Sequence, residues 1–93
     1  MSQDYSLQFL IRRREIADIE DTIRELQECL ENVERHLRLA STRIMIREKK
    51  HQMALYRDRE HTRLLAQIEE LQQTKLLFLE KIKEAEYFLQ RVK

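Results

Sequence analysis

Three histidines and one cysteine are the side chains of this 93-residue sequence best suited to metal or nucleophilic chemistry. No two of His36, His51 and His61 are three or four positions apart, the spacing that places two ligands on one helical face. Cys29 is the only cysteine, so an internal disulfide is excluded, and we interpret it as a small helix residue beside the apolar seam. The absence of glycine excludes a glycine-rich phosphate loop. We therefore predict no enzyme, no cofactor, no metal site and no small-molecule substrate.

Basic side chains, the remaining candidates for chemistry, gather in the middle of the chain. Residues 43–63 carry seven Lys or Arg against three acids, a net charge of +4, whereas residues 1–42 have −3 and residues 64–93 have zero. A protein that binds nucleic acid usually combines basic residues with aromatic side chains that stack on the bases, or carries its basic residues in a compact stripe. Here Tyr56 is the only aromatic residue and acids interrupt the run, so nucleic acid is not expected as a partner. An acidic protein surface is a better match, and a solvated polar interval is the simpler alternative.

The composition determines which elements can position these side chains. Glycine, proline and tryptophan are absent, so the usual residues of turns are missing and nearly uninterrupted helix is predicted. Charged residues make up 38% of the chain, with three Phe and three Tyr, which is too polar for a conventional core. No apolar run approaches the roughly 20 residues needed to span a bilayer. These features are typical of an all-α protein of long coiled-coil helices, and the single cysteine fits a reducing, cytoplasmic compartment.

A first apolar seam begins at Ile16. Its members alternate in steps of three and four, which is the 3.5-residue repeat of a coiled coil. They are Ile16, Ile19, Ile23, Leu26, Leu30, Val33, Leu37, Ala40 and Ile44. The positions between them are largely acidic, and we interpret these acids as a solvated face rather than a metal site.

A second seam occupies the C-terminal third and has Lys75 as its one polar member. Its apolar residues are Leu64, Ile68, Leu71, Phe78, Ile82, Ala85, Leu89 and Val92. Further apolar residues lie outside this stripe, namely Leu65, Leu76, Leu77, Leu79, Tyr87 and Phe88. A helix that is apolar on several sides contacts more than one neighbour, so this segment predicts a bundle or an assembly around it.

The two seams are out of phase, because Ile44 and Ile68 are 24 residues apart, three more than three heptads. Continuing the first register places Arg47 and His51 in the core. An antiparallel two-helix hairpin explains the shift, and one continuous helix with a register shift near 47–61 is the alternative. The similar lengths of the seams favour the hairpin. The predicted division is a frayed segment 1–8, a first helix 9–46, a polar turn 47–53 and a second helix 54–93.

The middle of the chain resembles the C-terminal region of tektins, the filament proteins of ciliary and flagellar doublet microtubules. In tektins, a stretch of the form E-G-P-L-K-L-A-x-T-R-L leads at the same spacing into the nonapeptide R-P-N-V-E-L-C-R-D, followed by F-R-L-x-x-E-V-x-x-L. The residues that fit the first part are Leu37, Leu39, Ala40, Thr42 and Arg43. Those that fit the nonapeptide are Met53, Leu55, Arg57 and Asp58, and those that fit the last part are Arg63, Leu64, Ile68 and Leu71.

The nonapeptide of this sequence departs from the tektin pattern. Lys50, His51 and Gln52 replace Arg-Pro-Asn, Ala54 replaces the acid and Tyr56 replaces the cysteine. Loss of the proline removes a helix breaker, and loss of the cysteine argues against a cysteine-dependent role. The resemblance implies that this segment lies at an exposed loop or end-to-end contact between proteins. The partner-contact residues it implies are Met53, Leu55, Tyr56, Arg57 and Asp58.

The resemblance implies a structural protein of the cytoskeleton in the axoneme of a cilium or flagellum. Its expected partners are other tektin-like or coiled-coil filament proteins, and also tubulin. Because tektins are several times longer, the chain would correspond only to their final part. The alternatives are a generic coiled-coil adaptor or tether, a stalk hairpin of a secretion or flagellar-export system, and a basic-helix nucleic-acid binder.

Overall fold

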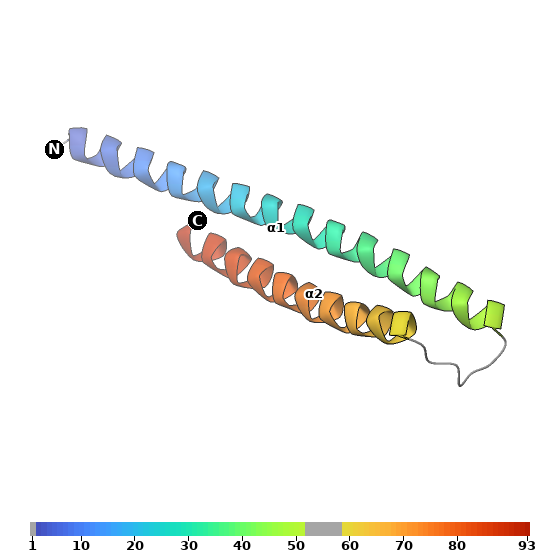
Figure 1. Cartoon of the computed structure of the whole chain (residues 1–93). Coiled ribbons are helices and arrows are strands. Elements are labelled where there is room, and N and C mark those ends of the chain that lie inside the picture. Colours follow the sequence, from blue (N-terminus) through green and yellow to red (C-terminus); the bar gives the residue numbers. More distant parts are fainter. Residues whose placement is uncertain (1, 52–58) are drawn as a thin grey trace.

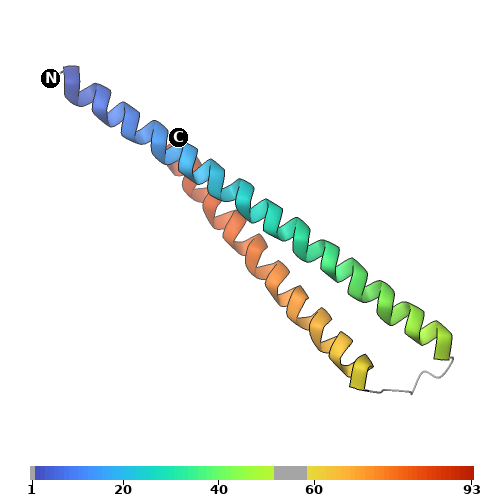
Figure 2. The same cartoon turned by 45° about the horizontal axis from the view of Figure 1, so that its top comes forward.

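The computed structural model describes residues 2–51 and 59–93, and within them the chain forms two helices, α1 (Ser2–His51) and α2 (Arg59–Val92). The helices lie side by side and run in opposite directions (Figure 1, Figure 2). The molecule measures 77 × 17 × 14 Å, which is a rod about two helices thick. The predicted all-α hairpin is confirmed, and one continuous helix does not fit this arrangement.

Both helices are continuous because nothing in their sequences breaks them. At 1.5 Å per residue, α1 is about 75 Å long and α2 about 51 Å. Helix-interior threonines satisfy their hydroxyls locally, since Thr22 donates to the Asp18 carbonyl and Thr74 donates to the Glu70 carbonyl, each at 2.9 Å. Neither helix, over the residues described, combines the length and apolarity needed to cross a membrane.

Helix α1 extends further in both directions than its apolar seam. It includes residues 2–8, assigned from the sequence to a separate N-terminal segment, and residues 47–51, assigned to the turn. Lys, Arg, Glu and Gln are favourable helix formers, so a loss of apolar pattern there does not require an end of the helix. The rest of the predicted turn, residues 52–53, and the predicted start of the second helix, residues 54–58, lie outside the described part.

The seams of α1 and α2 face each other along the length of α2. Ile23 shares a groove with Leu89, and Leu37 shares another with Gln72. The most buried side chains retain 3–9% of their accessible surface and are Val33, Ala40, Ile44 and Ile82. The core is therefore a thin line of contact, and most of each helix surface is open to solvent or to a partner.

Helix α1 is longer than α2 by about 24 Å, so its N-terminal part extends past the end of α2 (Figure 1). The large apolar side chains of this overhang are exposed, namely Leu7, Phe9, Leu10 and Ile11. The Arg13 guanidinium lies 5.8 Å from the centre of the Phe9 ring, a cation–π contact within the overhang.

Candidate interaction site

The seam residues named from the sequence all lie at positions of reduced exposure. In α1 these buried or half-buried residues are Ile16, Ile19, Ile23, Leu26, Leu30, Val33, Leu37, Ala40 and Ile44. In α2 they are Leu64, Ile68, Leu71, Phe78, Ile82, Ala85, Leu89 and Val92. Lys75, the polar member, is half-buried and lines a groove together with Glu34, which is also half-buried.

An ion pair joins the two helices at the end of the hairpin where α1 ends and α2 begins. The Arg47 side chain continues the α1 seam one step beyond Ile44 and is 22% exposed. Its Nη1 donates to Glu60 Oε2 across 2.6 Å, which is a short, charge-assisted hydrogen bond. Glu60 also lies in the first turn of α2, where the helix dipole favours a negative charge. The pair therefore holds the start of α2 against the end of the α1 seam.

A groove of about 480 Å³ lies beside this ion pair, between α1 and α2. Its lining residues are Arg43, Ile46, Arg47, Glu60, Arg63, Leu64 and Gln67. We call this surface the basic groove, because its three guanidinium groups outnumber its one carboxylate. Arg43 and Arg63 are exposed at its rim, where their fork-shaped donors can bind carboxylates of another protein. Ile46 and Leu64 add apolar surface between the charges.

Positive charge extends from the basic groove over the end of the rod where α1 ends and α2 begins. Residues 43–50 of α1 carry four basic side chains and one acid, and residues 59–63 of α2 carry two basic side chains and one acid. The middle of α1 is acidic, since residues 17–34 carry seven acids and only Arg24 as a base. The charges are thus separated along the rod axis, an arrangement that can set the register of a neighbouring charged rod.

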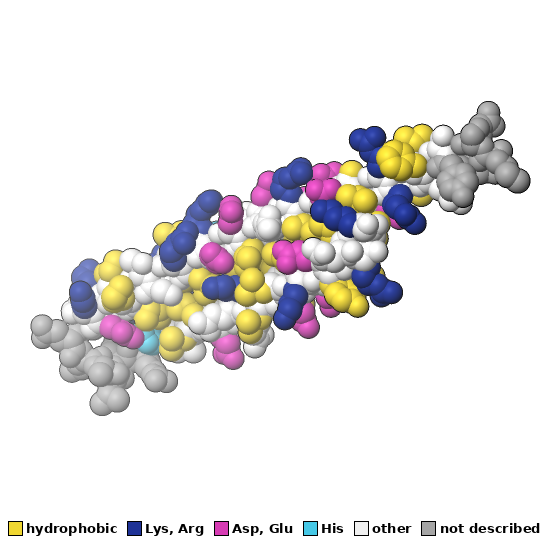
Figure 3. Space-filling view, turned by 180° about the vertical axis from the view of Figure 1, so that it is seen from behind, with side chains coloured by type: hydrophobic (Ala, Val, Ile, Leu, Met, Phe, Trp, Pro, Cys, Tyr) yellow, Lys and Arg dark blue, Asp and Glu magenta, His cyan; other side chains and the backbone are white. Residues whose placement is uncertain are grey.

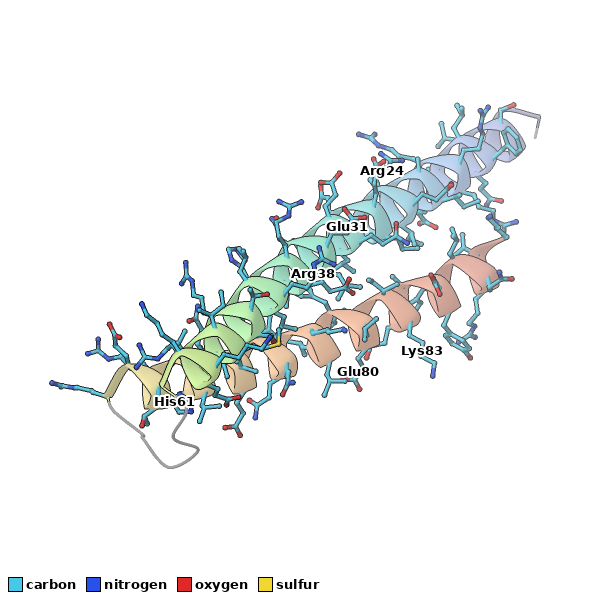
Figure 4. The ribbon with its side chains drawn as sticks, turned by 90° about the vertical axis from the view of Figure 1, so that its right-hand side faces the viewer. Arg24, Glu31, Arg38, His61, Glu80 and Lys83 are labelled. Atoms are coloured by element: carbon cyan, nitrogen blue, oxygen red, sulfur yellow. The ribbon has the colours of Figure 1, made fainter. Side chains whose placement is uncertain are left out.

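The histidines and acids whose side chains the structure describes do not gather into a metal site. His61 is half-buried one step before Leu64 in the α2 seam (Figure 4), whereas His36 is exposed on α1. Among the side chains of residues 6–50 and 59–93, no three of His, Cys, Asp or Glu come close enough to hold a metal ion. Cys29 is exposed on α1.

Apolar side chains are also exposed on the outside of the hairpin, where Figure 3 shows hydrophobic groups interspersed with charged ones. On α1 these are Leu39, Met45 and Ile46 in addition to the overhang. On α2 they are Leu65, Leu76, Leu77, Leu79, Tyr87 and Phe88. These six α2 residues are the ones that the sequence places outside the narrow seam.

The residues implied as partner contacts by the tektin resemblance are Met53, Leu55, Tyr56, Arg57 and Asp58. They lie outside the described residues, so their role stays a prediction. Lining residues of the basic groove lie on both sides of this segment in the sequence, among them Arg43 before it and Arg63 after it.

Comparison with known proteins identifies the family of this hairpin. The family model described as Tektin family matches residues 4–93, which include both helices. The chain belongs to the tektin family. It is 35% identical to Tektin-4 of Homo sapiens over 79 residues, which cover 85% of this chain and 18% of that protein. It is 34% identical to Tektin-4 of Mus musculus over 88 residues, 92% of this chain and 20% of that protein.

The chain thus spans about a fifth of the length of these curated tektin relatives. No solved structure matches it. The tektin resemblance read from residues 34–71 is confirmed by the family match, which extends well beyond that stretch. The tektin family is a family of structural proteins and not of enzymes.

The contacts that this tektin hairpin makes between the end of α1 and the start of α2 could not be predicted from its sequence. Extending the first seam by one step indicates that Arg47 faces α2. Which residue of α2 pairs with Arg47 depends on the direction of α2 and on the length of chain between the helices, so Glu60 could not be predicted. Arg63 and Arg43 share the basic groove although they are twenty residues apart. The excess of positive charge over residues 43–63 indicated a basic surface but not which residues form the basic groove.

Proposed function

We propose that this tektin-family chain is a structural component of the axonemal doublet microtubules of a cilium or flagellum. It acts by packing its helices laterally against other tektin-like or coiled-coil filament proteins, or against tubulin. The observation that carries this proposal is the tektin family match over both helices. The shape supports it, since a rod 77 Å long with a thin seam leaves most of its surface for neighbours.

The basic groove supports an acidic surface as one of these neighbours. Arg43 and Arg63 are exposed near the end of α1 and the start of α2, where the local net charge is positive. Exposed charges of this kind set the encounter rate and the register of a complex and are sensitive to salt. We therefore assign the basic groove the role of aligning the rod on an acidic partner, with residues 53–58 as a further contact.

Co-sedimentation of the full chain with reconstituted tektin filaments and with microtubules tests the proposal. The double reversal Arg43→Glu/Arg63→Glu should reduce the bound fraction several-fold at low salt, because four units of charge change at the contact. The matched control Arg24→Glu/Arg38→Glu makes the same charge change on exposed positions away from the basic groove (Figure 4). It should bind nearly as well as the unmodified chain.

Equal losses in the two reversed proteins would reject the basic groove as the contact. Absence of binding to either polymer by the unmodified chain would reject the proposed packing itself. Salt-dependent retention on DNA or RNA that is lost with Arg43→Glu/Arg63→Glu would support a nucleic-acid binder instead. A stable chain that binds none of the axonemal proteins would support the alternative function of a generic coiled-coil tether.

A further inference from the structure

The outer face of α2 carries a regular stripe that no part of the described hairpin covers. Leu65, Leu76 and Tyr87 are each eleven residues apart and are 39%, 65% and 61% exposed. Eleven residues make three helical turns plus about 20°, so these side chains lie nearly in line on one face. Lys83 and Glu80, which lie between Leu76 and Tyr87, project from the side of α2 that faces away from α1 (Figure 4).

The spacing of this stripe is symmetric about Leu76. Leu65 and Tyr87 lie eleven residues to either side, Glu69 and Lys83 lie seven residues to either side, and Gln72 and Glu80 lie four residues to either side. We define the outer stripe as Leu65, Glu69, Gln72, Leu76, Glu80, Lys83 and Tyr87; Gln72 is exposed at its edge, where it also lines the groove that contains Leu37. Its steps of three and four are those of a coiled-coil contact.

We propose that the outer stripe is a self-association surface through which α2 pairs antiparallel with α2 of a second copy of this chain. A two-fold axis at Leu76 brings the two Leu76 side chains together and places Leu65 of each copy against Tyr87 of the other. Glu69 of each copy then meets Lys83 of the second copy, so two complementary ion pairs form. Such a contact is isologous, and its symmetry closes at a dimer.

The charges select the antiparallel direction. In a parallel pair in register, Glu69 would face Glu69 and Lys83 would face Lys83, and both contacts would be repulsive. Neither Glu69 nor Lys83 is engaged in an ion pair inside the described hairpin. Both side chains are exposed and available to a second copy.

A hollow of about 360 Å³ on the outer face of α2 fits the same pairing. It is lined by Glu80, Lys83, Glu84, Tyr87 and Phe88. The first four have the i, i+3, i+4, i+7 spacing of a hole that receives a side chain in a coiled coil. Glu84 is already held by Lys81 at 3.6 Å. In the proposed register Glu69 of the second copy enters beside Lys83, and its Gln72 amide can donate to Glu80.

A second copy is the occupant that fits these observations, because one sequence supplies both halves of each contact. The seam of α1 packs against a different face of α2, so the two hairpins can dimerise without separating their own helices. The proposal goes beyond the axonemal function and does not depend on it. A chain that dimerises but does not bind axonemal polymers would support this inference and reject only the function proposed above.

Sedimentation equilibrium of the full chain tests the proposal, with circular dichroism to verify that each variant keeps its helix content. The unmodified chain should dimerise in the micromolar range. Lys83→Glu turns two attractions per dimer into two repulsions and should raise the dimer Kd about tenfold. The matched control Lys49→Glu makes the same charge change at an exposed position of α1, away from the outer stripe and its hollow, and should leave the Kd within about twofold of the original.

The combined swap Glu69→Lys/Lys83→Glu should restore the original Kd, because it rebuilds both ion pairs in the antiparallel direction. A parallel dimer would instead respond little to Lys83→Glu, since its contacts at both positions are repulsive before and after the change. Three results would overturn the proposal: a chain that stays monomeric, a dimer indifferent to Lys83→Glu, or a swap that fails to restore dimerisation. A monomer that binds only a different helical protein would assign the outer stripe to that partner.

Discussion

The ion pair between Arg47 and Glu60 can be tested by a double-mutant cycle. Arg47→Met keeps an unbranched apolar stem at the half-buried seam position and removes the charge. Glu60→Gln keeps the shape of the side chain and removes its charge. The four proteins of the cycle separate the coupling between the two residues from the other effects of each substitution.

The structure sets the expected size of this coupling. The 2.6 Å contact and the 22% exposure of Arg47 favour a strong interaction, but Glu60 is 73% exposed and competes with water. We therefore expect a coupling free energy of about 0.5–1 kcal/mol, within the range of exposed pairs. For a domain of this size that corresponds to roughly 2–8 °C in the melting temperature. In one continuous helix the two residues would be about 20 Å apart, and the coupling would vanish.

The assay is thermal and urea unfolding followed by far-ultraviolet circular dichroism, at low and at molar salt. The coupling should be largest at low salt and should shrink at molar salt, where the Debye length falls to about 3 Å. Measurements at several protein concentrations separate unfolding of the hairpin from dissociation of a dimer. A coupling of zero at low salt would refute the pairing of Arg47 with Glu60 and, with it, the described register of the two helices.

Three further predictions concern the seam and the overhang. Ile44→Ala should lower the free energy of unfolding of the hairpin by about 2 kcal/mol, because Ile44 is buried. Ile46→Ala, at a 57% exposed position, should lower it by less than about 0.5 kcal/mol. Urea unfolding measures both values. Equal costs would contradict the assigned seam. Lys75→Leu should stabilise the hairpin by about 1 kcal/mol in the same assay, because it fills a half-buried seam position with apolar surface; destabilisation would show that the ammonium group is needed there. Amides of residues 6–15 should exchange with deuterium faster than those of residues 30–44, because α2 covers only the latter; equal protection would contradict an uncovered overhang.

Much of the fold could be predicted because a coiled-coil seam repeats every 3.5 residues and is therefore visible in a short stretch of sequence. Ile16 to Ile44 and Leu64 to Val92 follow steps of three and four, and the same positions are the less exposed ones in the structure. The phase shift between Ile44 and Ile68 allows either a hairpin or one continuous helix with a register shift, and the similar lengths of the two seams favour the hairpin. The helix ends were harder to place, since 47–51 lack an apolar pattern but also lack any residue that breaks a helix.

The candidate site was predictable only in outline. The excess of Lys and Arg over residues 43–63 indicated a basic surface, but a sequence pattern does not state which residues meet across a hairpin. That depends on the direction of α2 and on the length of chain between the helices, so Glu60 and Arg63 could not be matched with Arg47 and Arg43. In contrast, the exposed apolar residues of α2 followed directly from an apolar face wider than one seam.

The central claim, that this tektin-family hairpin is built into the axoneme, is tested most directly by its location in a ciliated or flagellated cell. A tagged full chain should remain with the doublet microtubules after the membrane and soluble proteins are extracted with detergent. The Arg43→Glu/Arg63→Glu protein should be lost into the soluble fraction to a greater extent than Arg24→Glu/Arg38→Glu. An unmodified chain that leaves entirely with the soluble fraction, or that is located away from cilia and flagella, would contradict the claim.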